Sequence, residues 1–469
     1  MYQTLHRLVT GALCALTLAI LASCSQHGGE ILNTIPASTS AVAMADIKAI
    51  CSDLGITLTK EGPVYGDSIK NNIPANLDEF ARLASGLQES GAADLTSVAV
   101  FMAEGGTPVA TFAISNFDDF KETVGDKLTW GSDAEGMHVG WHENRISVIA
   151  SDNQAWLSDY SDEAAKTVKT ALDQAKKNPL GKIEGVAHHL GGQGLIRIAT
   201  VSQISAGGDD NTAEAQQTLW NAASVTSEGQ TLTINYSLIK GDGEKQTFKG
   251  LQTINPAVLA YVPAGMTVAA AAGVTPEFDW SVLGQLAALT GDFQTQAMLS
   301  AAMPYLTSID GTVLLAAGPA NEDAYSDLDP GNWRFILMAH LSQEKVNQLL
   351  GMVRTMCFTA GITPREDPRT GSLIIPQYGM DMHMGNIDGY FTVANFPIDD
   401  TNNNDLAPLF VNQQAAAQVN LPRLSDAMLF MPDWGVDARM QMAGTDARVT
   451  VSLPGSKGSV LGNLLQLML

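Results

Sequence analysis

The chain has 469 residues and a formal net charge of −23, with 45% hydrophobic and 16% charged residues. This composition is typical of a globular, core-forming protein long enough for two or three domains. The acidic balance excludes nucleic acid as an expected partner and disfavours attraction to anionic headgroups, so we expect it to serve solubility.

The first 23 residues are typical of a secretory signal peptide. Arg7 is the only Lys or Arg before Cys24, and the apolar stretch Leu8–Leu21 is shorter than the ~20 residues that span a bilayer. It ends in Leu21-Ala22-Ser23-Cys24, which resembles the lipobox of bacterial lipoproteins. The resemblance implies cleavage before Cys24, lipid on its sulfur and acylation of the new amino group. The membrane is then a partner through a lipid anchor at Cys24, and a plain signal peptide with a chance cysteine is the alternative.

The rest of the chain divides into two halves with similar sequence patterns. "TIPASTSAVAMADIKAICSDLG" from Thr34 and "YVPAGMTVAAAAGVTPEFDWSVLGQL" from Tyr261 both place Pro-Ala before a strand-like run and a short helix. Further segments match in order: a helix leading into a strand, a strand followed by a helix, a hairpin, one strand and a final hairpin. We predict residues 24–30 as a tether and 31–253 and 254–469 as homologous α+β repeats. Each would be an antiparallel sheet with packed helices, because regular βαβ units are missing.

Several turns and helices are predicted within these halves. Hairpin turns are expected at Glu143-Asn144, Glu228-Gly229, Asp388-Gly389 and Gly444-Thr445, where turn residues separate alternating segments. The hairpin "MHVGWHENRISVIASDN" is matched with "MHMGNIDGYFTVANFP". The first half carries an extra amphipathic helix over 162–177, ended by Pro179.

The lipobox and the Ile-Pro-Ala opening at Ile35 together resemble envelope lipoproteins of Bacteroides-type Gram-negative bacteria, a family of unknown function. The resemblance implies no activity. Ser25 is not the aspartate that typically retains lipoproteins at the inner membrane, and no acidic residue precedes Glu30 to favour surface export. We therefore expect an outer-membrane lipoprotein that faces the periplasm, with surface exposure as the alternative.

Two cysteines follow Cys24, and both lie on apolar helical faces. Ile47, Ile50 and Cys51 follow helical spacing, and Cys357 continues a similar stripe. We predict that Cys51 and Cys357 pack as small hydrophobes, each in its own core. An oxidising compartment leaves a disulfide between them as the alternative.

Three segments contain metal-ligand residue types. Asp399–Asp405 alternates oxygen ligands like a calcium loop, but it lacks the sixth-position glycine and the twelfth-position glutamate, so a surface loop is preferred. His188 and His189 would point to opposite faces of a strand and could not chelate one metal well. Met380, Met382 and Met384 share one strand face, which would suit Cu(I), although methionine also fills cores. We predict no metal and no cofactor.

No catalytic residue is predicted. Ser342 and Lys345 have a Ser-x-x-Lys spacing, but helix capping is preferred. Trp130 and Trp141 would suit sugar stacking, and core packing is preferred.

The sequence thus favours a non-catalytic binding or scaffold lipoprotein of the cell envelope with an unknown ligand. One alternative is a hydrolase using His138, His142 or His340 beside a carboxylate and a nucleophile. A lipid or lipoprotein carrier with a large apolar cavity is the other alternative.

Overall fold

The computed structural model describes residues 28–66, 69–70, 73, 75–142, 145–202, 218–280, 303–320, 332–377, 380–398, 406–422 and 433–468. They form two compact units. The first unit comprises the described residues up to Gln246 together with those from Lys457 onward, and the second unit runs from Thr247 to Ser456. Helix α13 (Val460–Met468) therefore belongs to the first unit, whereas the sequence analysis placed it in the second repeat. The predicted signal peptide and Cys24 lie outside the described residues.

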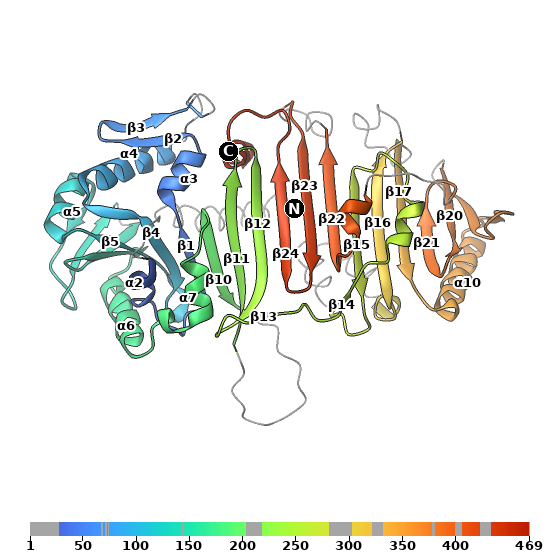
Figure 1. Cartoon of the computed structure of the whole chain (residues 1–469), viewed down its shortest axis with the longest axis horizontal. Coiled ribbons are helices and arrows are strands. Elements are labelled where there is room, and N and C mark those ends of the chain that lie inside the picture. Colours follow the sequence, from blue (N-terminus) through green and yellow to red (C-terminus); the bar gives the residue numbers. More distant parts are fainter. Residues whose placement is uncertain are drawn as a thin grey trace, which may run out of the picture. The chain divides into compact units, whose positions relative to one another are not determined.

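The first unit, coloured blue to green in Figure 1, contains one large antiparallel sheet. In sheet order its strands are β12 (Thr231–Lys240), β11 (Leu219–Glu228), β10 (Ile196–Val201), β1 (Ala41–Ala45), β4 (Ala93–Met102), β5 (Pro108–Ile114), β9 (Gln154–Asp159), β8 (Ile146–Ala150), β7 (His138–His142) and β6 (Thr129–Trp130). The short β13 (Lys245–Gln246) pairs with β12, and β2 (Ile56–Thr59) forms a separate hairpin with β3 (Gly62–Tyr65).

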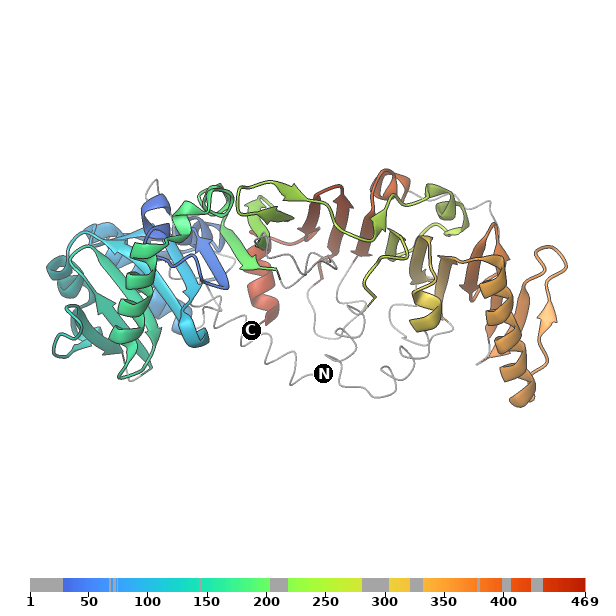
Figure 2. The ribbon, with the colours of Figure 1, turned by 90° about the horizontal axis from the view of Figure 1, so that it is seen from below.

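Helices cover both faces of this sheet. On one face lie α3 (Ile47–Asp53), α4 (Ala75–Ser90) and α5 (Phe117–Val124), and on the other lie α2 (Gly28–Leu32), α6 (Ala164–Lys177) and α7 (Glu184–Leu190). Figure 2 shows α6 lying along the sheet. Alternate residues of a strand enter different cores: Val148 and Ala150 pack with α3, α4 and α5, whereas Ile149 packs with α2, α6 and α7. Burial on both faces explains why central strands are apolar almost throughout. The 3₁₀ segments are η1 (Glu104–Gly106), η2 (Gly125–Lys127) and η3 (Leu180–Lys182).

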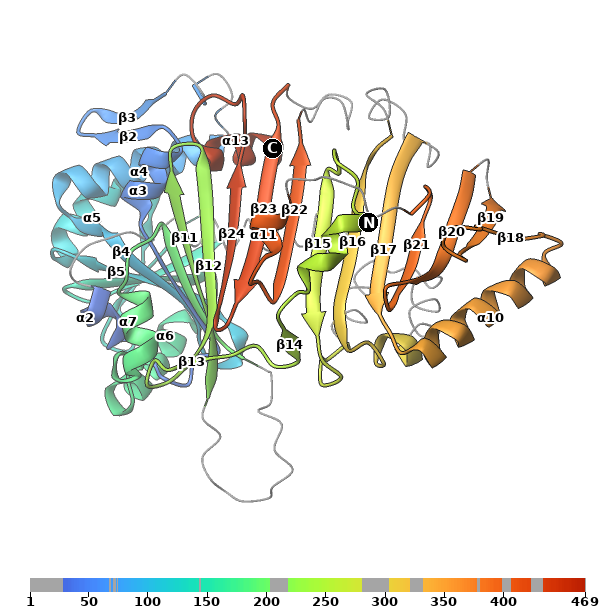
Figure 3. The ribbon, with the colours of Figure 1, turned by 45° about the vertical axis from the view of Figure 1, so that its right-hand side comes forward.

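The second unit also contains an antiparallel sheet, most of whose strands can be followed in Figure 3. In sheet order they are β24 (Asp446–Ser452), β23 (Val436–Ala443), β22 (Ala415–Leu421), β15 (Val268–Val274), β16 (Gly311–Pro319), β17 (Trp333–His340), β21 (Tyr390–Ala394), β20 (Met380–Ile387), β19 (Leu373–Gln377) and β18 (Arg365–Glu366). The short β14 (Leu251–Gln252) pairs with β15. One core contains η4 (Pro256–Tyr261) and α11 (Ala407–Phe410), and two others contain α10 (Gln343–Thr359).

The two sheets have the same strand order, position by position. The α+β class with antiparallel sheets and packed helices is therefore confirmed. The matched hairpins, however, are displaced by one strand, because β5 pairs with β9 as β17 pairs with β21. β20 and β21 thus occupy the places of β8 and β9 rather than those of β7 and β8. Alternating half-buried patterns recur in every such hairpin, so the similarity of the two sequence segments does not fix their positions in the sheets.

The hairpin turns have residues with positive φ at the positions where the chain reverses. Asp388 (φ 49°) and Gly389 (φ 85°) connect β20 to β21, and positive φ at both positions is what a two-residue I′ turn requires. Gly229 (φ 59°) and Gly444 (φ 61°) serve the β11–β12 and β23–β24 hairpins. The turns predicted at Asp388-Gly389 and Gly444-Thr445 are confirmed, the one predicted at Glu228-Gly229 lies one residue later at Gly229-Gln230, and Glu143-Asn144 lies outside the described residues. Over the part of the chain that is described, no helix is long and apolar enough to cross a membrane.

Candidate functional site

A pocket of about 560 Å³ opens in the first unit. Five chain segments meet there: the residues after Pro36, the start of α7, strand β10, strand β11, and the turn after β12. Its lining residues are Ala37, Ser38, Thr39, Ile183, Val201, Thr218, Trp220, Lys240, Gly241 and Asp242. The volume falls within the range typical of small-molecule sites.

Main-chain hydrogen bonds fix the Ile-Pro-Ala segment at one wall. The amide of Ala37 donates to the Asn178 carbonyl at 2.9 Å, and the amide of Leu180 donates to the Ile35 carbonyl at 2.8 Å. The hydroxyl of Thr39 lies 2.9 Å from the carbonyl oxygens of both Ala41 and Met102. The wall is therefore rigid, and the Thr39 hydroxyl is already used by the backbone.

A glycine contact fixes the opposite wall. Gly185 in the first turn of α7 packs on Gly243, so that a Cβ at Gly185 would lie 2.2 Å from the Gly243 nitrogen. The amide of Gly185 also donates to the Gly241 carbonyl at 3.0 Å. Only glycine permits this approach of two backbones. The contact positions Lys240, Gly241 and Asp242 at the edge of the pocket.

Both charged side chains of the pocket interact with Glu244. The ammonium of Lys240 forms an ion pair with the carboxylate of Glu244, and Asp242 accepts a hydrogen bond from the Glu244 amide at 2.9 Å. Trp220 is 1% exposed, and its buried indole nitrogen has no hydrogen-bond partner. Together with Ile183 and Val201, Trp220 makes the lining partly apolar. The arrangement suits a small ligand with an apolar body and a polar edge.

The three histidines considered for catalysis lie outside this pocket. His138 Nδ1 is 2.9 Å from an Asp133 carboxylate oxygen, and its ring stacks on Phe117. His142 Nδ1 is 2.9 Å from the Lys127 carbonyl. In the second unit, His340 Nδ1 hydrogen-bonds to the Asp310 carbonyl. Each ring is therefore held by a group beside it.

The expectation that His188 and His189 lie on a strand was wrong, because both belong to helix α7. Nε2 of His189 lies 3.0 Å from the Ile198 carbonyl and 3.1 Å from the Ala223 carbonyl. Burial lowers the pKa of His189. The neutral ring with hydrogen on Nε2 thus connects α7 to β10 and β11. Gly191, which caps the helix, was the available signal for a helical end.

Two of the three methionines of β20 fill a core as preferred, whereas the Met380 sulfur accepts a hydrogen bond from the Asn395 amide at 3.8 Å. Met382 and Met384 pack against Cys357, Leu373 and Ile375 in the core beside α10. The Asp399–Asp405 segment lies outside the described residues. Among the residues that are described, no group of three His, Cys, Asp or Glu side chains is placed to hold a metal ion.

Helix capping by Ser342 and core packing of Trp130 are confirmed, whereas Trp141 is half-buried and belongs to none of the described cores. Ser342 is the N-cap of α10 and accepts a hydrogen bond from the Lys345 amide at 3.4 Å. Trp130 packs edge-on against Phe117, with ring centroids 5.0 Å apart. Trp141 lies against Gly131, where a Cβ would come within 2.7 Å of its ring.

Both later cysteines are buried free thiols, as predicted from their helical faces. Cys51 belongs to the core with α3, α4 and α5, and Cys357 belongs to the one beside α10. Burial, assisted by the negative charge of Asp46, raises the pKa of Cys51 to about 12. The disulfide alternative is therefore absent from the structure.

The sequence analysis missed the pocket residues Ser38, Trp220, Lys240 and Asp242. The Ile-Pro-Ala segment was noticed as a repeat signature, not as a wall of a site. The Gly241-Asp242-Gly243 turn was a second available signal, because two glycines around a polar residue often mark a close backbone approach.

Comparisons with known proteins identify no family for this chain. No protein-family model matches the chain, and no curated protein matches it. Two solved structures of TP0453 are similar in part. Crystal form IV has 10% identity and a TM-score of 0.26, covering 46% of this chain and 83% of that one. Crystal form III has 13% identity and a TM-score of 0.29, with coverages of 45% and 80%. TM-scores this low support no conclusion about fold or function.

Proposed function

We propose that the protein is a lipid-anchored protein of the cell envelope whose body is a non-catalytic binding module. The anchor is Cys24 in the lipobox Leu21-Ala22-Ser23-Cys24. The first buried side chains of the body, Ile31 and Leu32, follow Cys24 closely. Helix α2 already begins at Gly28, so four residues of chain, at most about 14 Å, separate it from the lipid. The body would thus sit close to the membrane.

Cysteine substitution tests the anchor. The variant Cys24→Ala should remain an unprocessed precursor or become soluble, because the acyl chains supply the membrane affinity. A matched Cys51→Ala variant changes a buried thiol and should fractionate with the membrane like the wild type. Normal membrane fractionation of Cys24→Ala would contradict the anchor.

The proposed location is the outer membrane, with the body in the periplasm. The support is the absence of an aspartate at position 25 and of acidic residues before Glu30. Protease added to intact cells should leave the body uncut until the outer membrane is permeabilised. Digestion without permeabilisation would show that the body faces outward.

We also propose that the two units are homologous. The support is the shared strand order, in which β12 through β6 correspond one to one with β24 through β18. Chance similarity of two antiparallel sheets need not reproduce non-sequential neighbours such as β1 between β4 and β10 and β15 between β16 and β22. An experimental structure in which equivalent strands failed to superpose would refute this proposal.

The residues that line the pocket support a binding function rather than a catalytic one. Lys240 is ion-paired with Glu244, and main-chain groups engage the Thr39 hydroxyl and the Asp242 carboxylate, so these contacts do not join the three side chains into a nucleophile–base pair. A useful probe is anilinonaphthalene sulfonate, whose apolar rings match the half-buried Ile183 and Val201 of the lining.

The test uses two exposed serines that are two residues apart. Ser38 lines the pocket, whereas Ser40 does not. The variant Ser38→Phe should fill the pocket and weaken probe binding at least about tenfold, the effect of losing roughly 1.4 kcal/mol. Ser40→Phe should bind the probe like the wild type. Equal binding by both variants would show that the pocket is not the binding site.

A further inference from the structure

The last two turns of helix α10 expose large apolar side chains to solvent. Met352, Met356 and Phe358 are 44%, 62% and 87% exposed. Figure 3 shows this end of α10 beside β18, at the outer edge of the second sheet. Together the three side chains expose roughly 400 Å² of apolar surface, and a patch of that size on a soluble protein is often functional.

The patch is continuous along the helix surface. Met352 and Met356 are four residues apart and are therefore neighbours on one side of α10. Thr355 lies three residues from both Met352 and Phe358, and Thr359 lies three residues from Met356, so the two threonines connect the apolar side chains. Another side of the same helix packs in the core beside β19 and β20. The exposed side is thus additional to the one that the fold uses.

The threonine hydroxyls within the patch do not depend on water. The Thr355 hydroxyl donates to the Gly351 carbonyl at 3.0 Å, and the Thr359 hydroxyl donates to the Thr355 carbonyl at 2.9 Å. Both bonds are made to the carbonyl four residues earlier, within the helix. Burial of this side would therefore leave the hydroxyl donors paired.

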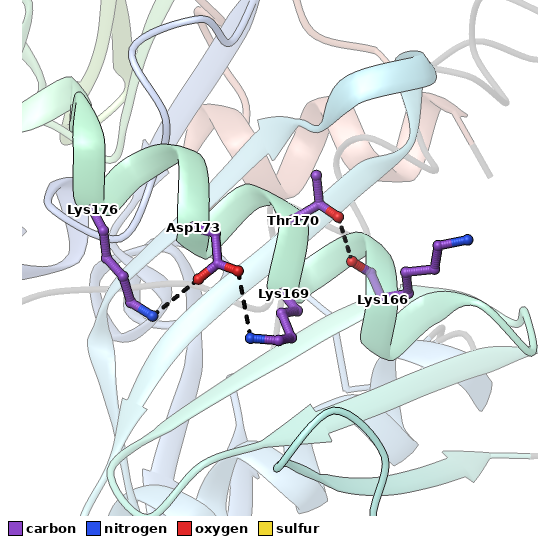
Figure 4. Close-up of polar contacts among 5 residues, drawn as sticks. All are labelled: Lys166, Lys169, Thr170, Asp173 and Lys176. Atoms are coloured by element: carbon purple, nitrogen blue, oxygen red, sulfur yellow. Dashed lines mark hydrogen bonds and ion pairs between the residues drawn. The ribbon is translucent and has the colours of Figure 1, made fainter.

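Helix α6 shows the contrasting case of an exposed helix side that stays hydrated. Figure 4 shows the Asp173 carboxylate between Lys169 and Lys176, with N–O distances of 3.4 and 3.0 Å. The Thr170 hydroxyl donates to the Lys166 carbonyl at 2.8 Å, as the threonines of α10 do, but here charged groups surround it. The bond becomes informative on α10 because the neighbours there are apolar.

Charge is nearly absent from the end of α10, although the chain as a whole is acidic. Over residues 346–364 the single charged residue is Arg354. Its guanidinium pairs with the Glu366 carboxylate at 2.8 Å. Removing this helix end from water therefore requires no unpaired charge to be dehydrated.

The carbonyl groups at the end of α10 are also satisfied by the chain. The amide of Gly361 (φ 70°) donates to the Phe358 carbonyl at 3.1 Å, and the amide of Ile362 donates to the Cys357 carbonyl at 2.8 Å. These two bonds form a Schellman ending, which glycine permits at positive φ. An apolar medium demands that backbone groups be paired internally, and this helix end meets that demand.

We propose that the end of α10 inserts Met352, Met356 and Phe358 among the acyl chains of a lipid bilayer. This rests on the proposed anchor at Cys24, which would hold the body at that surface. A stable protein interface buries about 800 Å² on each partner, about twice what this patch offers, so the area disfavours a second copy. A fluid bilayer needs no matching surface, and unbranched methionine side chains adapt to irregular surroundings.

The test uses the native methionines as reporters. The mature chain, beginning at Cys24, is coupled through that thiol to saturated phosphatidylcholine vesicles that contain a maleimide lipid. Cys51 and Cys357 are buried, so Cys24 is the thiol that reacts. Hydrogen peroxide in the aqueous phase converts accessible methionine to the sulfoxide, and mass spectrometry reads the rate at each position.

We expect oxidation of Met352 and Met356 to slow at least about threefold on the vesicles relative to the uncoupled chain, because inserted thioethers are removed from the aqueous oxidant. Half-buried Met102 in the first unit and Met440 in the second should react at the same rate in both samples. Salt at 1 M, where the Debye length is about 3 Å, should leave the protection unchanged, since apolar insertion is not screened.

Two matched variants separate the patch from exposed apolar residues in general. Phe358→Ser removes the largest side chain of the patch and should abolish the protection of Met352 and Met356. Val64→Ser removes an exposed apolar side chain of the first unit, 57% exposed, and should keep it. Both positions are exposed, and neither change alters the charge.

Equal oxidation with and without vesicles, equal protection of Met102 and Met440, or protection that survives Phe358→Ser would overturn the proposal. So would protection that appears without vesicles as the protein concentration rises, because a second copy would then cover the patch. Chemical coupling makes the result independent of lipidation in cells. Fractionation of Cys24→Ala can therefore fail without affecting this test, and the reverse also holds.

Discussion

Gly185→Ala should destabilise the first unit and disturb the pocket at the same time. The new Cβ would lie 2.2 Å from the Gly243 nitrogen, 2.3 Å from its Cα and 2.9 Å from the Lys240 carbonyl oxygen. All three atoms belong to the backbone, so α7 must move away by more than 1 Å to reach ordinary contact distances near 3.5 Å. Overpacking of this kind costs about 1–3 kcal/mol, and loss of the Gly185–Gly241 hydrogen bond adds about 1 kcal/mol. The higher helix propensity of alanine offsets up to about 1 kcal/mol of this cost, so the free energy of unfolding should fall by about 1–3 kcal/mol in total.

Gly86→Ala is the matched control, because it makes the same change inside another helix of the first unit. At Gly86 the Cβ would meet only Thr123 Cγ2, at 3.7 Å, and the residue is exposed. Its free energy of unfolding should rise by about 0.5–1 kcal/mol. Urea unfolding followed by circular dichroism, together with probe binding at the pocket, gives both readouts. Unchanged stability and unchanged probe binding in Gly185→Ala would refute the backbone contact between α7 and the turn after β12.

Three further outcomes follow from the described contacts. Leu461 of α13 packs on the core that contains Leu54, so Leu461→Ala should lower the free energy of unfolding by about 1 kcal/mol and raise hydrogen exchange in α3. Increased exchange confined to β15–β17 would contradict the assignment of α13 to the first unit. Burial lowers the pKa of His189, so below the unfolded value of about 6.5 the unfolded chain binds a proton that the folded chain does not. The stabilisation should be fully present above that pH and should be lost as the pH falls below it. Between pH 7 and 5 the urea midpoint should therefore fall less in His189→Gln than in the wild type. Because the pKa of Cys51 is about 12, its thiol should resist iodoacetamide at pH 8 until denaturant is added, and rapid native alkylation would show that it is not buried.

Sequence patterns predicted most local elements because each depends on near neighbours. The amphipathic spacing around Cys51 and Cys357 identified buried helix faces, and the turns at Gly229, Asp388-Gly389 and Gly444 required residues that tolerate positive φ. His188-His189 was the exception. A seven-residue helix is too short for its periodicity to stand out from that of a strand.

The pocket could not be predicted in the same way, because its walls are far apart in the chain. Ser38, Ile183, Trp220 and Lys240 come from four elements, and they meet only after the sheet has formed. Gly185 and Gly243 look like ordinary glycines in the sequence. Their requirement for glycine arises from a backbone contact between a helix and a turn that are 58 positions apart.

The sequence by itself determined the α+β class, several hairpin turns and helices and the resemblance to a lipobox at Cys24, because hydrophobic periodicity, turn residues and the lipobox pattern are all local in character. Only the tertiary structure decided that β21 has the position in its sheet that β9 has in the other, that α13 joins the first unit and that the Ile35–Ala37 segment pairs with Asn178–Leu180. These choices depend on which distant strands and helices exclude water from each other. Local spacing does not encode that selection, since several partners present the same alternating apolar face.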